Sequence, residues 1–272
     1  MYETFFGMAE APFSLTPNTK YFFMSEPHEG VLRTLLYGVE RRSGFLLLTG
    51  EVGSGKTTTT RALLNLLKDT VETSLILNPL LSTLDLIKCI NTDFGIACAS
   101  DSIQDQIKLL NDFLLLLNGY GKTALVVIDE AQNLSFDAFE MTRMLSNLET
   151  ESQKLLTILL VGQPELKHKL EDVRLRQLSQ RIQIKIDLQA LTLNQTGEYI
   201  RHRVSRAGEK AMAHFDERAI KQIFKRSQGI PRLINNICDL GLMAAYAQNT
   251  RVIDATLIGR ALKEVPRYVC HS

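Results

Sequence analysis

The 272-residue chain lacks the features of a membrane-spanning, secreted or metal-cluster protein. Its longest apolar runs, 155–161 among them, are far shorter than the roughly 20 residues that span a bilayer. The opening sequence MYETFFGMAEAPFSL has no basic segment followed by an apolar core, so it does not resemble a secretory signal peptide. The few cysteines show no C-x-x-C spacing and no histidine cluster, which argues against a zinc site and a disulfide framework. They are Cys89, Cys98, Cys238 and Cys270. We therefore expect a cytoplasmic location.

The net charge is also small, +1 at neutral pH, and identifies no partner by itself. The apolar and charged fractions, 45% and 22%, are those of an ordinary soluble globular protein and exclude disordered and fibrous classes. The charge is unevenly distributed, because residues 167–232 hold 15 Lys or Arg and 7 Asp or Glu. This basic segment could face a nucleotide, a neighbouring subunit, anionic lipid or DNA. It could equally be a solvated face that pairs with the acidic remainder.

A phosphate-binding loop is the most informative feature that is present. Residues 50–57, GEVGSGKT, fit the pattern G-x-x-x-x-G-K-[ST] between a strand-like segment, 44–49, and a helical one, 58–67. In this setting backbone N–H groups and the positive end of the helix dipole point at an anion. We expect Lys56 to reach the β- and γ-phosphates of a nucleotide and the Thr57 hydroxyl to hold Mg²⁺. The remaining nucleotide contacts are expected from Gly50, Glu51, Val52, Gly53, Ser54, Gly55 and Thr58.

Two adjacent carboxylates follow another buried strand. Asp129 and Glu130 end the segment VVIDE, and ligands bind at the carboxyl ends of strands in an open α/β sheet. Asp129 is expected to hold Mg²⁺ through water, and Glu130 to orient and deprotonate the attacking water. The alternative is that Asp129 only caps the next helix. The phosphate loop upstream favours the catalytic interpretation.

Strand-like and helical segments alternate as far as about residue 190, which predicts a parallel sheet covered by helices on both faces. Expected strands are 45–49, 74–78, 124–128, 155–161 and 182–186, and expected helices are 28–42, 58–67, 84–94, 103–117, 136–149 and 166–181. After about residue 191 the strands are expected to stop. Four helices follow, at 194–207, 216–227, 231–248 and 254–264, with Asp216 and Asp254 as N-caps. We place a domain boundary near residue 190, between an α/β core, 1–190, and a small helical lid, 191–272. The first 27 residues, rich in aromatic residues and proline, are expected to form an irregular arm that packs on the protein.

Phosphoryl transfer also needs positive charge near the developing γ-phosphate, and arginine is suited to this role. By position, Arg181 and Arg232 are the best candidates, followed by Arg174 and Arg176. Taken as isolated residues, all of them could be surface or ion-pair arginines.

Six separated segments, in order along the chain, resemble the ExeA/GspA-like family of AAA+ ATPases. They are FFGMAEAPFSLTPNTKYFF, GEVGSGKTT, VVIDEAQNL, ILLVGQPEL, LRQLSQRI and SQGIPRLINNICD, and the resemblance covers roughly residues 1–265. It implies an α/β AAA+ P-loop NTPase fold with a small C-terminal helical lid. It also implies Mg²⁺-dependent ATP hydrolysis, with ATP or ADP as the ligand.

The resemblance assigns further roles residue by residue. Asn78 resembles the polar switch residue that senses the γ-phosphate side of the site and can restrain Glu130. Gln163 stands where AAA+ proteins keep the first sensor, which is more often Asn. Arg181 resembles the finger that a neighbouring subunit inserts into the active site, and Arg232 the second sensor, which couples lid to nucleotide. The aromatic residues at 21–23 and the helix from His28 would border the adenine, or would only pack.

A finger donated in trans implies a homo-oligomer whose hydrolysis depends on protein concentration. Full-length family members of the secretion type continue past the lid into a membrane-spanning helix and a periplasmic, peptidoglycan-binding part. This chain ends at Ser272, after Pro266 and the tail RYVCHS. We expect either the cytoplasmic ATPase portion of a longer product or a stand-alone relative.

Three functions remain open. The whole-chain resemblance favours a cytoplasmic ATPase, with peripheral attachment at the inner membrane as an option, that drives assembly of a type II secretion or pilus apparatus through a membrane-bound partner. The alternative is a transposition-helper ATPase of the TniB/TnsC kind acting on double-stranded DNA, which would give the basic segment a purpose, although no extra DNA-binding module is visible. The third is a non-enzymatic ATP-binding scaffold, against which the intact Glu130 argues.

Overall fold

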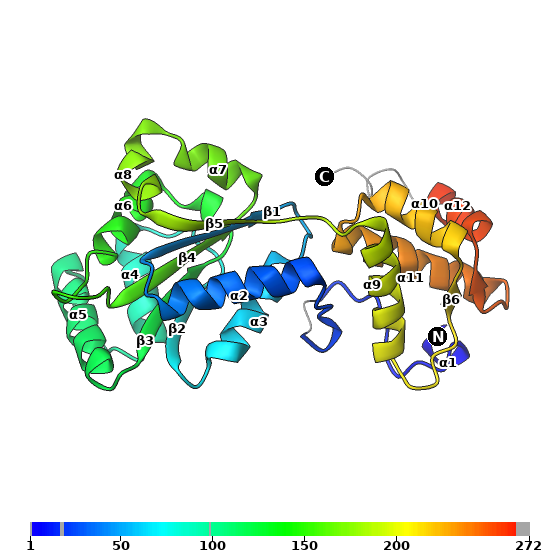
Figure 1. Ribbon diagram of the computed structural model, residues 1–272, viewed down its shortest axis with the longest axis horizontal. Helices are drawn as coiled ribbons and strands as arrows, with labels where there is room; N and C mark the ends of the chain where they lie inside the picture. The colour runs from blue at the N-terminus through cyan, green and yellow to red at the C-terminus, as the bar shows by residue number, and fades with distance from the viewer. Residues whose placement is uncertain (1, 17–18, 98, 265–272) are drawn as a thin grey trace. The chain divides into compact units, whose positions relative to one another are not determined.

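The computed structural model describes residues 2–16, 19–97 and 99–264 (Figure 1). Contacts between residues divide the chain into two units. The sheet unit comprises Pro27–Gly50 and Thr59–Leu188, and the helical unit comprises Met1–Glu26, Glu51–Thr58 and Gln189–Ser272. Pro17, Cys98, Pro266, Cys270 and the tail RYVCHS, about which the sequence raised expectations, lie outside the described residues. No helix within the described ranges is both long and apolar enough to cross a membrane.

The sheet unit contains five strands that are all parallel, as predicted, and the structure places them in the order β2-β3-β4-β1-β5. The strands are β1 (Phe45–Gly50), β2 (Val71–Ile76), β3 (Thr123–Ile128), β4 (Leu156–Gly162) and β5 (Ile182–Leu188). The helices are α2 (Glu26–Glu40), α3 (Lys56–Leu67), α4 (Thr83–Asp93), α5 (Ile103–Gly119), α6 (Phe136–Leu145), α7 (Pro164–Leu170) and α8 (Arg176–Ser179). Figure 1 shows α2 and α3 on one side of the sheet and α6, α7 and α8 on the other.

Both faces of the sheet are buried, because successive side chains of a strand point to opposite faces. Phe45 and Leu47 of β1 belong to the apolar cluster that includes residues of α4 to α8. Leu46 and Leu48 are also fully buried or nearly so, and lie on the other face. There a Cβ on Gly38 of α2 would come within 2.6 Å of Leu46 Cδ2, so the helix packs directly on β1. Residues 45–48 of strand β1 are therefore all apolar, without alternating polar residues, because helices cover both faces of the sheet.

Strand β2 and the helix predicted at 136–149 both end before their predicted last residues. Strand β2 ends at Ile76, its last residue paired with β3, and not at 78. The predicted helix 136–149 ends at Leu145. Near that end the hydroxyls of Thr142 and Ser146 donate to the carbonyls of Phe139 and Arg143, and such local side-chain bonds compete with helix continuation.

The predicted helix 166–181 is interrupted. It consists of α7, the 3₁₀ helix η3 (Val173–Leu175) and α8. The Asp172 side chain accepts a hydrogen bond from the Arg174 N–H at 2.9 Å, and this cap starts a new turn. The apolar residues therefore keep a helical spacing across 166–181, although the helix is interrupted at Asp172.

The helical unit contains α9 (Leu193–Arg206), α10 (Glu217–Ser227), α11 (Pro231–Ala247) and α12 (Ala255–Glu264). Asp216 accepts from the Ala219 N–H and Asp254 from the Leu257 N–H, which confirms both predicted caps. The expectation that strands stop after residue 191 is wrong. Strands β6 (His214–Phe215) and β7 (Val252–Ile253) form a parallel pair, and two residues are too few for a recognisable alternation.

The N-terminal arm belongs to the helical unit, whereas we expected it to be part of a core covering 1–190. It contains α1 (Tyr2–Phe5) and the 3₁₀ helix η1 (Thr19–Tyr21). Phe6 and Phe13 are buried in the apolar cluster formed with α9 to α12. Arg203 of α9 donates hydrogen bonds to the carbonyls of Pro12 and Ser14. Extensive packing thus accounts for the aromatic residues of the arm.

Candidate functional site

The phosphate loop joins the end of β1 to the start of α3, as its sequence pattern requires. Gly53 and Gly55 have positive φ angles of 77° and 104°, which side chains of L-residues strongly disfavour. The first turn of α3 carries no acidic side chain that could neutralise the positive end of the helix dipole. The loop thus has the backbone conformation and the electrostatics of an anion-binding turn.

The burial and hydrogen bonding of two loop side chains indicate that the loop binds a polar ligand. Lys56 is only 6% exposed, and its Nζ donates to the Glu51 carbonyl at 3.0 Å, so the ammonium is folded back over the loop. Ser54 is 1% exposed, and its Oγ has no hydrogen-bond partner in the described part of the chain. Buried polar atoms are almost always hydrogen-bonded, so an orphaned hydroxyl in this loop fits a ligand that brings polar atoms.

Arg232, the predicted second sensor, is next to the phosphate loop. It is the second residue of α11, and its N–H donates to the Gly53 carbonyl at 3.2 Å. A Cβ on Gly53 would lie 2.4 Å from Arg232 Cβ, so only glycine permits this approach. The turn before α11 is held in the same way, because Leu191 N–H donates to the Gly229 carbonyl at 3.0 Å.

The carboxylate pair follows directly on β3. Asp129 is 4% exposed, and its N–H donates to the Ile76 carbonyl at 2.8 Å. Its Oδ1 accepts from the Glu130 N–H at 2.9 Å. The following 3₁₀ helix η2 (Ala131–Asn133) has no side-chain cap, and α6 is capped by Ser135. Asp129 therefore caps neither helix, which removes the alternative interpretation of this residue.

The Glu130 carboxylate is held by two glutamines. Its Oε2 accepts from Gln132 Nε2 at 2.6 Å and from Gln163 Nε2 at 3.0 Å. Gln163 is the first residue after β4, and its N–H donates to Gln132 Oε1 at 3.2 Å. Gln132, in turn, accepts at its carbonyl from Lys169 Nζ at 2.8 Å. Burial lowers the pKa of the Lys169 ammonium from its usual value.

Sequence reasoning missed Gln132. Its only indication was a polar side chain two residues after Glu130, on the loop that continues β3. Gln163, which the sequence singled out, does lie against Glu130. Asn78 does not: it is exposed, two residues beyond β2, and its Oδ1 accepts from the Leu80 N–H at 3.3 Å. Asn78, predicted to restrain Glu130, therefore makes no hydrogen bond to it among the described residues, whereas Gln163, predicted as the first sensor, does.

The candidate finger, Arg181, is bound within its own chain. Its Nη1 donates to the Arg143 carbonyl at 3.4 Å, to Ser146 Oγ at 3.2 Å and to Asn147 Oδ1, all at the C-terminal end of α6. The helix dipole there favours a cation.

The two second-choice arginines differ from each other. Arg174 pairs with Asp172 at 2.7 Å, and its guanidinium lies 3.4 Å from the centre of the Phe136 ring. Arg176 is exposed at the start of α8.

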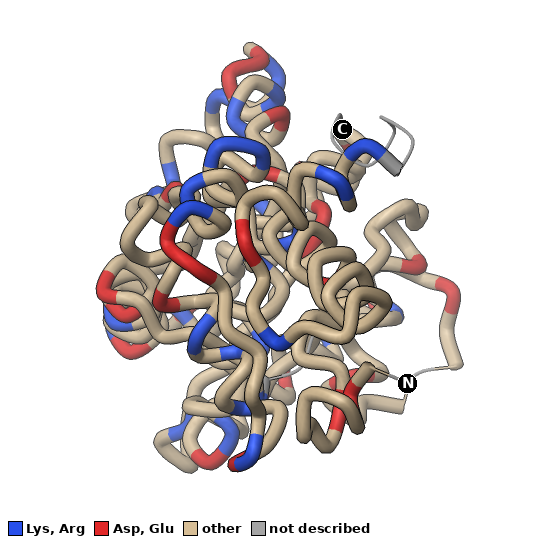
Figure 2. The backbone as a smooth tube through the Cα atoms, turned by 90° about the vertical axis from the view of Figure 1, so that its right-hand side faces the viewer, with Lys and Arg blue, Asp and Glu red and all other residues tan. Residues whose placement is uncertain are grey.

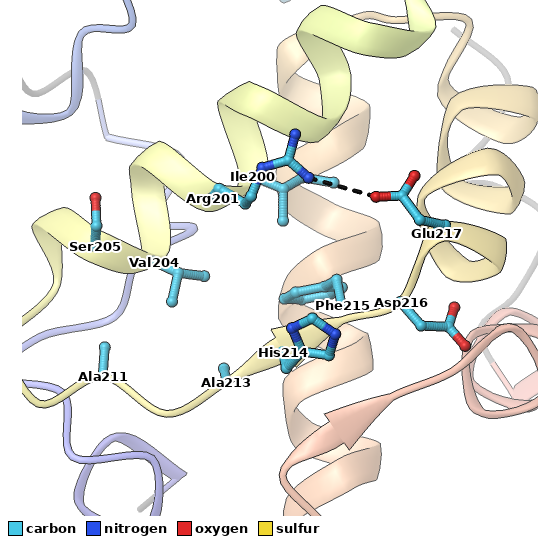
Figure 3. A pocket seen from close by; sticks show the side chains of 10 residues that line it. All are labelled: Ile200, Arg201, Val204, Ser205, Ala211, Ala213, His214, Phe215, Asp216 and Glu217. Carbon is cyan, nitrogen blue, oxygen red and sulfur yellow. Dashed lines mark ion pairs between the residues drawn. The ribbon is translucent and has the colours of Figure 1, made fainter.

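The helical unit also contains a hollow of about 430 Å³ between α9 and β6 (Figure 3). Ile200 and Val204 line one wall and Phe215 another, while Arg201 and Glu217 form an ion pair of 3.7 Å at its edge. No residue predicted to contact nucleotide lines this hollow.

Comparison with known proteins shows what the chain is similar to. A family model described as an AAA domain matches residues 39–170. General secretion pathway protein A of Aeromonas hydrophila is 43% identical over 266 residues, which cover 97% of this chain and 48% of that protein. The chain therefore spans about half the length of this curated relative.

Solved structures show the same fold at low sequence identity. Cdc6p from Pyrobaculum aerophilum has a TM-score of 0.69 and 21% identity, covering 93% of this chain and 70% of that chain. The Aeropyrum pernix ORC1 protein, solved in complex with DNA, has a TM-score of 0.66 and 15% identity, covering 95% of this chain and 70% of that chain. The 43% identity over 97% of this chain, together with the AAA domain match, shows that the chain belongs to the ExeA/GspA-like family of AAA+ ATPases.

Proposed function

We propose that the chain binds and hydrolyses ATP with Mg²⁺ and that hydrolysis drives assembly of a type II secretion or pilus apparatus. The phosphate loop carries the proposal. Two glycines with positive φ, a buried lysine and an unshielded helix start are what a nucleotide polyphosphate requires. The 43% identity to a general secretion pathway protein supports the cellular role.

Each predicted residue takes a role in this proposal. Loop N–H groups and Lys56 bind the β- and γ-phosphates. The Thr57 hydroxyl and the Asp129 carboxylate would hold Mg²⁺, which supplies positive charge against the charge that develops on the phosphates. One or two carboxylates suffice, because Mg²⁺ takes its other ligands from phosphate and water. Strands β1 and β3 are parallel in one sheet, so the loop and the carboxylates leave the sheet at the same edge.

Glu130 orients the attacking water and accepts its proton. The water oxygen then bonds to the γ-phosphorus as the bond to the bridging β–γ oxygen breaks. Gln163 and Arg232 sense the γ-phosphate from the sheet and from the lid, and Asn78 is a further switch position. Arg181 acts in trans in a homo-oligomer, after it leaves its contacts on α6.

The contacts of the basic segment favour a protein partner over DNA. Part of its positive charge is used within the chain, and Figure 2 shows that acidic and basic positions both recur along the backbone. Lys167 pairs with Asp187 at 2.9 Å, and Lys169 donates to two backbone carbonyls. We therefore propose a cytoplasmic protein that acts on a membrane-bound component of the apparatus, with peripheral attachment at the inner membrane.

Steady-state ATP hydrolysis at low salt, with and without double-stranded DNA, tests the proposal. Lys56→Ala is the blank, and its rate should be about 100-fold or more below wild type, since the lysine stabilises transition-state charge. Equal rates in the two proteins would contradict the assignment of the loop. Stimulation by DNA that fades as salt rises would instead indicate a transposition-helper role. The logarithm of the DNA-binding constant falls as the logarithm of the salt concentration rises, with a slope of about −0.9 for each neutralised phosphate.

A further inference from the structure

Gln132 donates the shorter of the two hydrogen bonds to Glu130. Both glutamine amides meet a single carboxylate oxygen, Oε2, at 2.6 Å from Gln132 and 3.0 Å from Gln163. The other oxygen, Oε1, has no hydrogen bond to a described residue. The carboxylate is thus fixed through one oxygen, and the second is left to accept a proton.

The orientation of the Gln132 amide follows from its neighbours. A backbone N–H can only donate, so the atom of Gln132 that meets the Gln163 N–H at 3.2 Å must be the amide oxygen. The NH₂ group must then face Glu130. A flipped amide would place its oxygen against a carboxylate oxygen and its NH₂ against an N–H, and would lose both hydrogen bonds.

The loop that carries Gln132 is itself fixed. Lys169 Nζ donates to the carbonyls of Gln132 and Leu134 at 2.8 and 2.6 Å. Gly162, the last residue of β4, leaves room for the side chain, since a Cβ there would lie 2.7 Å from Gln132 Oε1. Backbone, side chain and neighbouring strand therefore all hold the amide in one place.

We propose that Gln132 is a positioning residue that holds the Glu130 carboxylate in the orientation from which Oε1 accepts the proton of the attacking water. The proposal rests on the ATP hydrolysis proposed above. Gln132 acts through Glu130 and touches no phosphate, so its loss should lower kcat and leave the KM for ATP unchanged. A positioned base contributes roughly 100- to 10,000-fold, and Gln163 still holds the carboxylate, so a fall of about tenfold is expected.

The test uses Gln132→Met, which keeps the length of the side chain and removes both amide hydrogen bonds. Gln106→Met is the control, because Gln106 is also hydrogen-bonded through its amide, to Asn91 and Ser100, in a part of the sheet unit outside this cluster; it is 1% exposed, whereas Gln132 is partly buried. Gln132→Met should show the fall in kcat at unchanged KM, and Gln106→Met the wild-type kcat. An unchanged or increased kcat in Gln132→Met would overturn the inference.

A second measurement needs no nucleotide. The melting temperatures of Gln132→Met, Glu130→Ala and the double variant form a cycle, and a bonded pair should give shifts that do not add. Additive shifts would show that the two side chains do not interact and would overturn the inference. Gly162→Ala supplies a second variant, because its Cβ would lie 2.7 Å from both Gln132 Oε1 and Leu166 Cδ2, and it should also lower kcat.

The failure of this inference differs from a failure of the proposed function. A wild-type chain with no more turnover than Lys56→Ala would overturn the ATPase, and the role of Gln132 in hydrolysis with it. A wild-type chain that hydrolyses ATP beside an unaffected Gln132→Met variant would overturn the inference alone.

Discussion

Glu130 combines an unfavourable backbone with a precise set of hydrogen bonds. Its φ of 50° lies in the left-handed region, which costs a non-glycine residue about 1–2 kcal/mol. Residues held in this way often occur at functional sites, where the surrounding structure determines their conformation. Here the surroundings are Asp129 on the backbone side and two glutamines on the carboxylate.

Replacing Glu130 by glycine should therefore give a more stable protein than replacing it by alanine. Both variants lose the carboxylate and its hydrogen bonds, but only glycine adopts the left-handed backbone freely. We expect the free energy of unfolding of Glu130→Gly to exceed that of Glu130→Ala by about 1 kcal/mol. Urea denaturation without nucleotide measures the difference.

Glu198, exposed within α9, is the matched control for this pair. There the order should reverse, with Glu198→Gly less stable than Glu198→Ala by about 1 kcal/mol, because glycine is a poor helix former. The same order at both positions would mean that the backbone of Glu130 is not strained.

Spacing in the sequence was enough to single out Lys56, Asp129 and Glu130 as candidates, because each stands at a fixed distance from a strand end. Gln132 escaped because its role depends on Gln163, which is distant in sequence and adjacent only once β3 and β4 pair. Residues whose chemistry is local are predictable from a motif. Residues whose chemistry depends on pairing between strands can be identified only once the structure of the sheet is known.

At the scale of elements, the turn before α11 fixes where that helix begins. Gly229 has a φ of 76°, and a Cβ there would lie 1.9 Å from the Leu191 carbonyl oxygen. That neighbour is backbone and cannot rotate away. The turn also places the start of α11, and with it Arg232, against the carbonyl of Gly53.

Gly229→Ala should destabilise the protein by at least about 2 kcal/mol, since it combines a left-handed backbone with a clash against a carbonyl. Gly30 of α2 provides the contrast, because a Cβ added there would have no other atom within 4 Å. Gly30→Ala should stabilise by up to about 1 kcal/mol. Chemical denaturation of both variants decides the matter, and a Gly229→Ala protein as stable as wild type would show that the turn can rearrange.

The central strands were predictable because each is a continuous apolar run between turns. Their parallel direction was predictable because helical segments alternate with them along the chain. The break at Asp172 and the strands β6 and β7 were not. Asp172 caps the start of η3 by a hydrogen bond from the Arg174 N–H, although the spacing of apolar residues stays helical across this point. Strands of two residues are stabilised by their tertiary neighbours and leave no periodicity to detect.

For the whole molecule, the proposed finger implies that activity belongs to an assembly. Arg181→Ala should bind ATP normally and lose turnover, and mixing it with Lys56→Ala chains should restore activity. In a mixed oligomer, an intact phosphate loop of one chain meets an intact arginine of another. Steady-state hydrolysis over a range of mixing ratios measures this recovery.

Arg176→Ala is the control for the same experiment, because Arg176 is an exposed arginine of the neighbouring α8. It should keep wild-type turnover. Melting curves must accompany the comparison, since Arg181 also binds the C-terminal end of α6. Mixtures that stay inactive while both variants remain folded would rule out donation in trans.

The division of the chain into two units has a mechanical consequence. The backbone passes between the sheet unit and the helical unit at four points, after residues 26, 50, 58 and 188. Two of these crossings flank the phosphate loop. A rotation of one unit against the other cannot turn on a single hinge, because it has to change backbone torsions on both sides of that loop. Any such rotation would therefore change the backbone on either side of residues 51–58, the segment proposed to surround the phosphates.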